Sequence, residues 1–367
     1  MEKGLNCNFP DYTIFWQAGI KTQIFKTFNF ISMKYYYTLL VLFVVLFSTN
    51  GQNNIKLKFD KNGEFKIVQF TDTHIDFINK KNLNVYDIVK KIIKTEEPDF
   101  VILTGDIITQ NDPQTGYLRF ANIFEKAKIP WAVIFGNHDG ESNVPREEIA
   151  KYLITLPYCL NSDDGKDDGV SGASNFVLPI YGKNSETEAL LYCLDSHNRS
   201  PLKSKVDGYG WFDFSQISWY LKQSRSFTKE NGGEPLPALA FFHIPLPEYT
   251  QAWENKINPP IGVKNEDECS PEINSGMYTA MLTGGDVMGT FVGHDHINDY
   301  IGVYHGMALA YGRVTKVMKN PDEDPLAGGR VIVLKEGVHS FDTWIRDMNG
   351  KRELDCNWPE SFNKKEE

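Results

Sequence analysis

The stretch DFVILTGD, residues 99–106, decides the fold class. Its apolar run from Phe100 to Leu103 is typical of a strand buried on both faces, and the run ends in Gly105 and the carboxylate Asp106. The same pattern occurs in FKIVQFTDTH (65–74) and WAVIFGNHD (131–139). Residues 83–93 and 117–127, which lie between these strands, carry apolar side chains at helical spacing. This alternation predicts parallel strands in an α/β fold.

The pattern continues over the rest of the chain and predicts one domain over residues 60–345. Further strands are expected in ALLYCLD (189–195), PALAFFHIP (237–245), MGTFVGHDH (288–296), GMALAYG (306–312) and RVIVLKE (330–336), with a helix near 214–222. Residues 157–175 and 246–276 are rich in Pro, Gly and Asp and are expected to frame the mouth of a site. Residues 346–367 are predicted to form a charged tail that frays.

Composition restricts the partners of this protein. The chain has 367 residues, of which 41% are hydrophobic, enough for a large core. Its net charge of -10 argues against nucleic acid, because binding a phosphate backbone requires clustered Lys and Arg. Small phosphorylated substrates stay possible, since bound cations reverse the local potential in an acidic protein. No protein partner can be inferred.

Residues 1–51 are predicted to be an N-terminal extension followed by a secretory signal peptide that begins at Met33. The segment MKYYYTLLVLFVVLFSTNGQ (33–52) has one lysine, then an apolar run from Leu39 to Phe47 that is short for a membrane span. Small residues precede the expected cut before Gln52, and the absence of cysteine there argues against a lipid anchor. We therefore expect a secreted or periplasmic protein without a stable membrane anchor. Met1 and Met33 both remain candidates for the start.

Four cysteines follow the signal peptide, at Cys159, Cys193, Cys269 and Cys356. They allow three disulfide pairings, among which the sequence does not choose, and isolated buried thiols are an equally good interpretation. None has CxxC spacing, so a zinc knuckle is not expected.

Five polar clusters follow the apolar runs: TDTH with Asp72 and His74, TGD with Asp106, GNHD with Asn137, His138 and Asp139, FFH with His243, and GHDH with His294 and His296. Each alone has an ordinary interpretation, such as a strand-end cap, a turn or a core histidine. Together the five clusters indicate a binding site, because α/β sheets bind ligands at the carboxyl ends of their strands. The clusters are therefore expected to converge on one crevice.

This ordered set resembles the calcineurin-like metallophosphoesterase superfamily. GNHDGES, FFHIPLPE and GHDHINDY are most similar to the small purple-acid-phosphatase-like group of plants, fungi and bacteria. The resemblance implies a four-layer αββα sandwich, in which two mixed β-sheets are flanked by helices and two metal ions lie between the strand ends.

The resemblance also implies the ligands. Asp72, His74 and His296 would bind the first ion, Asn137, His243 and His294 the second, and Asp106 both. Imidazole and carboxylate ligands suit Fe, Zn or Mn, as divalent or mixed-valence ions, and the sequence does not decide among them. Purple members place a tyrosine three residues after the bridging aspartate. Thr109 stands at that position here, so no tyrosinate ligand is expected from it.

His138 is the expected proton donor to the leaving group, with Asp139 orienting its ring. Asn298 and Asp299 are expected either to support the ligands or to form a plain turn. The aromatic residues of KSKVDGYGWFDFSQ (203–216), Tyr209, Trp211 and Phe212, are candidates for substrate stacking or for the core.

The predicted function is a secreted two-metal phosphatase that hydrolyses phosphate monoesters through a metal-bound hydroxide. A phosphodiesterase for a nucleotide or lipid head group has the same core motifs and is the alternative within enzymes. A non-catalytic, metal-stabilised binding protein is the alternative of another class.

Overall fold

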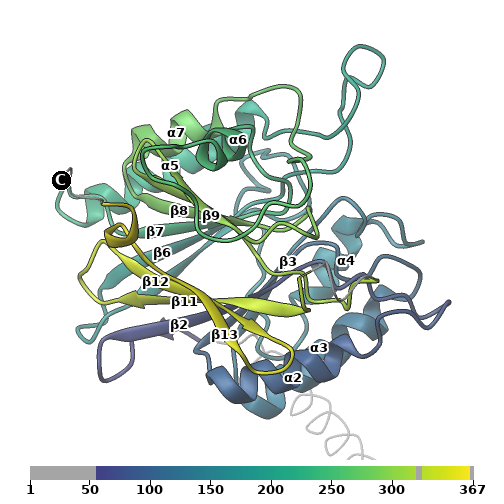
Figure 1. Ribbon diagram of the computed structural model, residues 1–367. Helices are drawn as coiled ribbons and strands as arrows, with labels where there is room; N and C mark the ends of the chain where they lie inside the picture. Colours follow the sequence, from purple (N-terminus) through teal and green to yellow (C-terminus); the bar gives the residue numbers. More distant parts are fainter. Residues whose placement is uncertain (1–54, 320–324, 364–367) are drawn as a thin grey trace, which may run out of the picture. The chain divides into compact units, whose positions relative to one another are not determined.

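The computed structural model describes residues 55–319 and 325–363, so the predicted signal peptide lies outside the described residues. The described chain forms a 7-stranded sheet with the order β1-β5-β6-β7-β8-β10-β9 and a 6-stranded sheet with the order β13-β12-β11-β2-β3-β4. The two sheets face each other and helices cover both outer faces (Figure 1). Both sheets contain parallel and antiparallel pairs. The predicted sandwich of two mixed sheets is therefore confirmed.

The strands are short and mostly buried. The 7-stranded sheet consists of β1 (Leu57–Lys58), β5 (Phe176–Tyr181), β6 (Thr187–Cys193), β7 (Ala238–Phe241), β8 (Val287–Val292), β9 (Ile301–Tyr304) and β10 (Met307–Tyr311). The 6-stranded sheet consists of β2 (Glu64–Phe70), β3 (Phe100–Thr104), β4 (Trp131–Ile134), β11 (Gly328–Lys335), β12 (Phe341–Asp347) and β13 (Arg352–Trp358).

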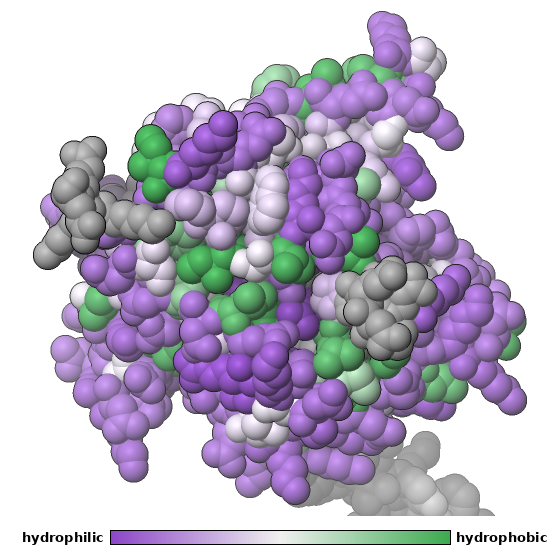
Figure 2. Space-filling view, viewed as in Figure 1, coloured by the Kyte–Doolittle hydropathy of each residue, from purple (hydrophilic) through white to green (hydrophobic). Residues whose placement is uncertain are grey.

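The helices form the two outer layers. α2 (Val85–Glu96), α3 (Pro113–Ala127) and α4 (Arg146–Leu153) share a hydrophobic core with the 6-stranded sheet. α5 (Phe214–Glu230), α6 (Glu248–Trp253) and α7 (Met277–Gly284) share another with the 7-stranded sheet. A short 3-10 helix, Glu360–Phe362, follows β13. The face of the molecule in Figure 2 is mostly hydrophilic, as expected when each helix buries only one side.

A third core lies between the two sheets and explains the continuous apolar runs. In β3, Phe100 and Ile102 point into the core between the sheets, whereas Val101 and Leu103 point toward the helices. Successive side chains alternate between the faces of a strand, so a strand covered on both faces must be apolar throughout.

Parallel pairing places the ends of the strands together. β2, β3 and β4 are parallel neighbours, and so are β6, β7 and β8. Their carboxyl ends therefore meet at one edge of each sheet, as the sequence predicted. Backbone hydrogen bonds join the two edges, for example from Thr315 N to Thr71 O at 2.9 Å.

The expected boundaries of the domain need two corrections. In the described part of the segment after residue 346, β13 pairs antiparallel with β12 and buries Cys356 in the core between the sheets, so residues 352–358 are not a frayed tail. Its charges have partners: Arg352 contacts Asp355, and Lys351 contacts Glu353 at 2.9 Å. At the other end, β1 pairs with β5 ahead of residue 60. Charged composition alone misled the prediction, because these strands are mostly exposed or half-buried, and β13 buries only Cys356.

The described part of the chain contains no disulfide: Cys159, Cys193 and Cys356 are buried free thiols, and Cys269 is an exposed one. The helices of this part are all too short or too polar to cross a membrane.

Candidate metal centre

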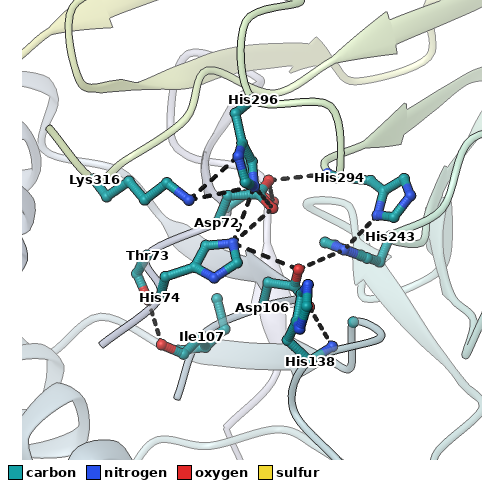
Figure 3. A network of polar contacts seen from close by, with 12 residues as sticks. Asp72, Thr73, His74, Asp106, Ile107, His138, His243, His294, His296 and Lys316 are labelled. Atoms are coloured by element: carbon teal, nitrogen blue, oxygen red, sulfur yellow. Dashed lines mark hydrogen bonds and ion pairs between the residues drawn. The ribbon is translucent and has the colours of Figure 1, made fainter. Parts of the chain in front are cut away.

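The seven predicted ligands lie at the carboxyl ends of five strands. Asp72 and His74 follow β2, Asp106 follows β3, and Asn137 follows β4. His243 follows β7, while His294 and His296 follow β8. The two sheets thus bring together residues more than 200 positions apart, such as His74 and His296 (Figure 3).

Four side chains form a first cluster: Asp72, His74, Asp106 and His296, whose ligand atoms lie within 4.8 Å of one another. The Nε2 atom of His74 is 3.0 Å from Nε2 of His296 and 3.5 Å from Oδ2 of Asp106. The Nε2 atom of His296 is 3.4 Å from Oδ1 of Asp72. All of these atoms face a common centre, as the proposed first ion requires.

A second cluster consists of Asp106, His243 and His294, whose ligand atoms also lie within 4.8 Å of one another. The Nε2 atom of His243 is 3.3 Å from Oδ2 of Asp106, and its Nδ1 atom lies 2.8 Å from the carbonyl of Thr104, to which it donates. That hydrogen bond leaves Nε2 free to bind a cation. Asp106 is the one residue common to both clusters, which is the position of a bridging carboxylate.

Unpartnered polar atoms test whether these residues fit two ions. Among the described residues, Asp72 Oδ1, Asn137 Oδ1 and His294 Nε2 are buried side-chain atoms without a hydrogen-bond partner. A buried polar atom without a partner costs about 1–3 kcal/mol, so several at one place indicate a missing ligand. All three belong to the predicted ligands, and two of them, Asp72 Oδ1 and Asn137 Oδ1, carry the test, because the nitrogen of His294 that faces His243, at 3.3 Å, is Nδ1. The residues therefore fit a dinuclear site of divalent metal ions.

The charges in the site favour cations. Burial opposes ionisation of Asp72 and Asp106. Hydrogen bonds from His296 and His74 nevertheless hold the pKa of Asp72 well below its ordinary value, and the charge and hydrogen bond of His243 lower the pKa of Asp106. Burial together with the charge of His243 lowers the pKa of His294 to about 3, which leaves its imidazole neutral. Ionised carboxylates and neutral imidazoles are the forms that bind metals. Against the effect of burial, Asp106 and Asp72 raise the pKa of His243 to about 10, so a metal that binds its Nε2 would displace a proton.

The backbone is strained at the ligands. Asp72, His74, Asp106 and His294 have φ values of 54°, 43°, 52° and 80°, in the left-handed region. Such a conformation costs about 1–3 kcal/mol at a non-glycine residue. It turns each side chain out of the strand direction and into the crevice.

Two glycines allow the close approach of the ligands. A Cβ atom on Gly136 would lie 2.3 Å from Oδ1 of Asp106, and one on Gly293 would lie 2.0 Å from Oγ1 of Thr71 and 2.6 Å from Oδ2 of Asp72. Any other residue would displace a carboxylate. The Gly of GNHD and of GHDH is therefore part of the site's construction.

The structure corrects the role assigned to Asp139. Its buried carboxylate does not contact the ring of His138. It accepts one hydrogen bond from the hydroxyl of Tyr117 and others from four backbone amides, those of Asp106, Ile107, Ile108 and Gly136. Nδ1 of His138 instead lies 2.7 Å from Oε1 of Glu141. Asp139 thus holds the turns that carry Asp106 and Asn137, and Glu141 orients His138.

His138 has the placement of a proton donor. Its ring centroid lies 5.4 Å from that of His74, and its backbone amide donates to Oδ1 of Asp106 at 2.8 Å. Its side chain is 35% exposed, whereas most of the ligands are buried. The ring is therefore beside the centre and open to a substrate.

The remaining residues singled out by sequence have structural roles. Asn298 accepts from the amides of Asn265 and Glu266, and Asp299 accepts from Val263 and pairs with Arg313, so neither supports a ligand directly. Thr109 is buried and donates its amide to Ile75.

The three aromatic candidates differ from one another. Phe212 belongs to the core beneath α5, and Trp211 is half-buried. The ring of Tyr209 meets His294 edge-on at 4.5 Å. Of the three, only Tyr209 is seen to touch a predicted ligand.

Sequence reasoning missed Glu141 and Lys316. Glu141 lies three residues after His138, a spacing that lets the two side chains meet across one turn, and this was a usable signal. Lys316, whose Nζ atom is 3.3 Å from Nδ1 of His296, follows β10 and has no local signal.

A groove of about 880 Å³ lies elsewhere, between α2 and α3. Its lining includes Tyr86, Ile93 and Ile123 and none of the predicted ligands. The candidate metal centre is therefore identified by its ligand side chains, and this groove is not part of it.

Two facing sheets with two clusters of ligands that share one aspartate define a class, the metal-dependent phosphoric ester hydrolases. Residues 65–298 match the model of the calcineurin-like phosphoesterases, and the chain belongs to that family. The chain is 33% identical over 287 residues to "Probable inactive purple acid phosphatase 29" of Arabidopsis thaliana, covering 70% of this chain and 73% of the relative. The predicted superfamily and its nearest group are thus confirmed.

Two further proteins extend the comparison. "Phosphatase DCR2" of Saccharomyces cerevisiae is 32% identical over 265 residues, which cover 65% of this chain and 45% of the yeast protein. A solved dimetal phosphatase from Danio rerio matches with a TM-score of 0.52 at 13% identity, over 80% of this chain and 98% of that chain. At that identity the structural match supports the fold.

Proposed function

We propose that the protein is a phosphatase that hydrolyses phosphate monoesters by in-line attack of an activated water. The observation that carries this proposal is Asp106, which two clusters of ligand atoms share. When bound, two divalent ions at these clusters would lower the pKa of a water toward ~7 and neutralise charge on the phosphoryl oxygens.

The chain's own residues supply the other parts of the reaction. Oδ1 and Oδ2 of Asp106 face the amide of His138 and the ring of His243, which fixes the carboxylate between the two clusters. His138 donates a proton to the departing oxygen, while Glu141 accepts from its Nδ1, which leaves Nε2 as the nitrogen that donates. Such general acid catalysis is worth about 10²–10⁴-fold.

Hydrolysis assays test the proposal directly. We expect the purified protein to release phosphate from p-nitrophenyl phosphate after addition of Mn or Zn, and to act more weakly on bis(p-nitrophenyl) phosphate. The Asp106→Ala variant serves as the control for a contaminating phosphatase. A clear preference for the diester would instead support the phosphodiesterase alternative.

A non-catalytic, metal-stabilised binding protein is the second candidate, because the names of Arabidopsis relatives include the words "probable inactive". In this chain all seven predicted ligand positions carry a ligand residue, and His138 is in place. Protein that contains two ions per chain but hydrolyses neither type of ester would favour the binding protein.

We also propose that the protein is exported and that the mature chain begins near Gln52, on the basis of the apolar run and small residues after Met33. N-terminal sequencing of the native protein checks this. Finding residues from 1–32 in the mature protein would contradict it.

A further inference from the structure

Lys316 lies beside the metal centre on a segment that is held in place by the opposite sheet edge. The amide of Thr315 donates to the carbonyl of Thr71 at 2.9 Å, and the amide of Thr71 donates to Oγ1 of Thr315 at 3.1 Å. Val314 and Thr315 are both buried. The backbone next to Lys316 is therefore fixed to the chain that carries Asp72.

The ammonium group of Lys316 points into the centre (Figure 3). Its Nζ atom is 3.3 Å from Nδ1 and 3.4 Å from Nε2 of His296. Within residues 55–319 and 325–363, no other lysine or arginine makes a hydrogen bond or ion pair with a predicted ligand. Lys316 thus adds a positive charge at the half-exposed side of the first cluster.

Binding of a metal changes what Lys316 can contact. The Nε2 atom of His296 faces Asp72 and His74, so this nitrogen would bind the ion. A neutral imidazole that binds through Nε2 carries its proton on Nδ1 and has no lone pair left for an ammonium group. Lys316 then requires another acceptor, and the phosphate of a substrate would lie beside it.

The charge balance indicates which phosphate. Counting only the ligands and the reacting groups, two divalent ions would bring four positive charges, Asp72 and Asp106 bring two negative ones and the attacking hydroxide a third, so one positive charge would remain. Lys316 raises the surplus to two. This matches a phosphate monoester dianion, whereas a phosphate diester carries one negative charge.

We propose that Lys316 determines specificity by binding a non-bridging phosphate oxygen, and that it favours dianionic monoesters over monoanionic diesters. The inference rests on the proposed function, since it concerns the substrate of the same site. Lys316 is separate from the ligands, so its removal should leave both ions bound.

The test compares Lys316→Met, which keeps the apolar stem, with Lys316→Arg, which keeps the charge, and with Lys319→Met as the matched control on an exposed lysine. Calorimetry on metal-loaded protein measures the Kd of inorganic phosphate. We expect Lys316→Met to weaken phosphate binding about 10- to 100-fold, the range for losing a charge-assisted hydrogen bond. Lys316→Arg should recover part of the loss, and Lys319→Met should bind normally.

The kinetic arm measures kcat/KM on p-nitrophenyl phosphate and bis(p-nitrophenyl) phosphate, with metal content checked on the same samples. Lys316→Met should lose activity mainly on the monoester. Equal losses on both esters, or an unchanged Kd for phosphate with both ions bound, would overturn the inference. If the unmodified protein hydrolyses neither ester, the proposed function fails, and the phosphate titration alone decides the role of Lys316.

Discussion

The 6-stranded sheet supplies the oxygen ligands of the centre, Asp72, Asp106 and Asn137, whereas the 7-stranded sheet supplies imidazoles alone, from His243 and two histidines after β8. The two halves also differ in backbone strain. Four predicted ligands have a backbone in the left-handed region, and three of them, including Asp106, belong to the 6-stranded half. Strain there requires support, and the carboxylate of Asp139 supplies it by accepting from four backbone amides.

The histidines of the 7-stranded half depend on the other half for their orientation. The ring of His243 donates to the carbonyl of Thr104, and the amide of His294 donates to Oδ2 of Asp72. Changes in the 6-stranded half should therefore affect both ions. Changes in the 7-stranded half should affect one ion more than the other.

The largest effect is expected from Asp106→Ala. Because Asp106 belongs to both clusters, its removal should abolish activity and reduce the content of both ions. Metal analysis of the purified variant, with circular dichroism to show that it is folded, checks this. Two tightly bound ions with normal turnover would show that the halves do not share this carboxylate.

His243→Ala should have the next largest effect, because it removes one ligand of the second cluster. We expect loss of most activity and weaker binding of one ion per chain, with the other retained. His296→Ala is the matched variant on the first cluster, and it should affect the other ion. Titration with a chelator distinguishes the two. Simultaneous loss of both ions in each variant would contradict a division into two clusters.

His138→Ala should retain both ions and lose about 10²–10⁴-fold in kcat on alkyl phosphates. The loss should be much smaller on p-nitrophenyl phosphate, because nitrophenolate departs well without a proton. Parallel assays on both substrates measure the difference. Equal losses, with chemistry rate-limiting and metal content intact, would indicate that His138 positions phosphate instead.

Glu141→Gln should have the smallest effect. The amide of the variant still accepts a hydrogen bond from His138 but carries no charge, so we expect about a fivefold decrease in kcat on alkyl phosphates, which corresponds to ~1 kcal/mol. The effect should disappear in the His138→Ala background, which a double-mutant cycle measures. An undiminished effect in that background would show that Glu141 acts independently of His138.

Asp139→Asn provides a contrast, since its role is structural. We expect a lower melting temperature from the weakened hydrogen bonds to the turns that carry Asp106 and Asn137. Any loss of activity should follow the loss of metal. Thermal unfolding of the apo-protein and metal analysis separate these effects, and a variant of normal stability and metal content that is inactive would restore Asp139 to a catalytic role.

The sequence by itself indicated the strands that end at the polar clusters, their parallel pairing and the seven ligand candidates, whereas β1, β5, β9, β12 and β13 were not predicted. This was possible because a strand buried on both faces must be apolar, and a polar or glycine residue that follows it at once marks its end, as in Leu103 to Asp106. The edge of a parallel sheet then gathers these ends. All of these signals are local in the chain.

Only the tertiary structure decided which neighbours each polar group has. Asp139 accepts hydrogen bonds from backbone amides instead of contacting His138. Glu141 contacts the ring of His138, and Lys316, which follows another strand, contacts His296. Likewise, β13 is ordered because β12 offers it an edge. A charged side chain with several rotatable bonds can reach many different hydrogen-bond partners. Packing between distant segments selects one of these partners, and the adjacent sequence does not specify which.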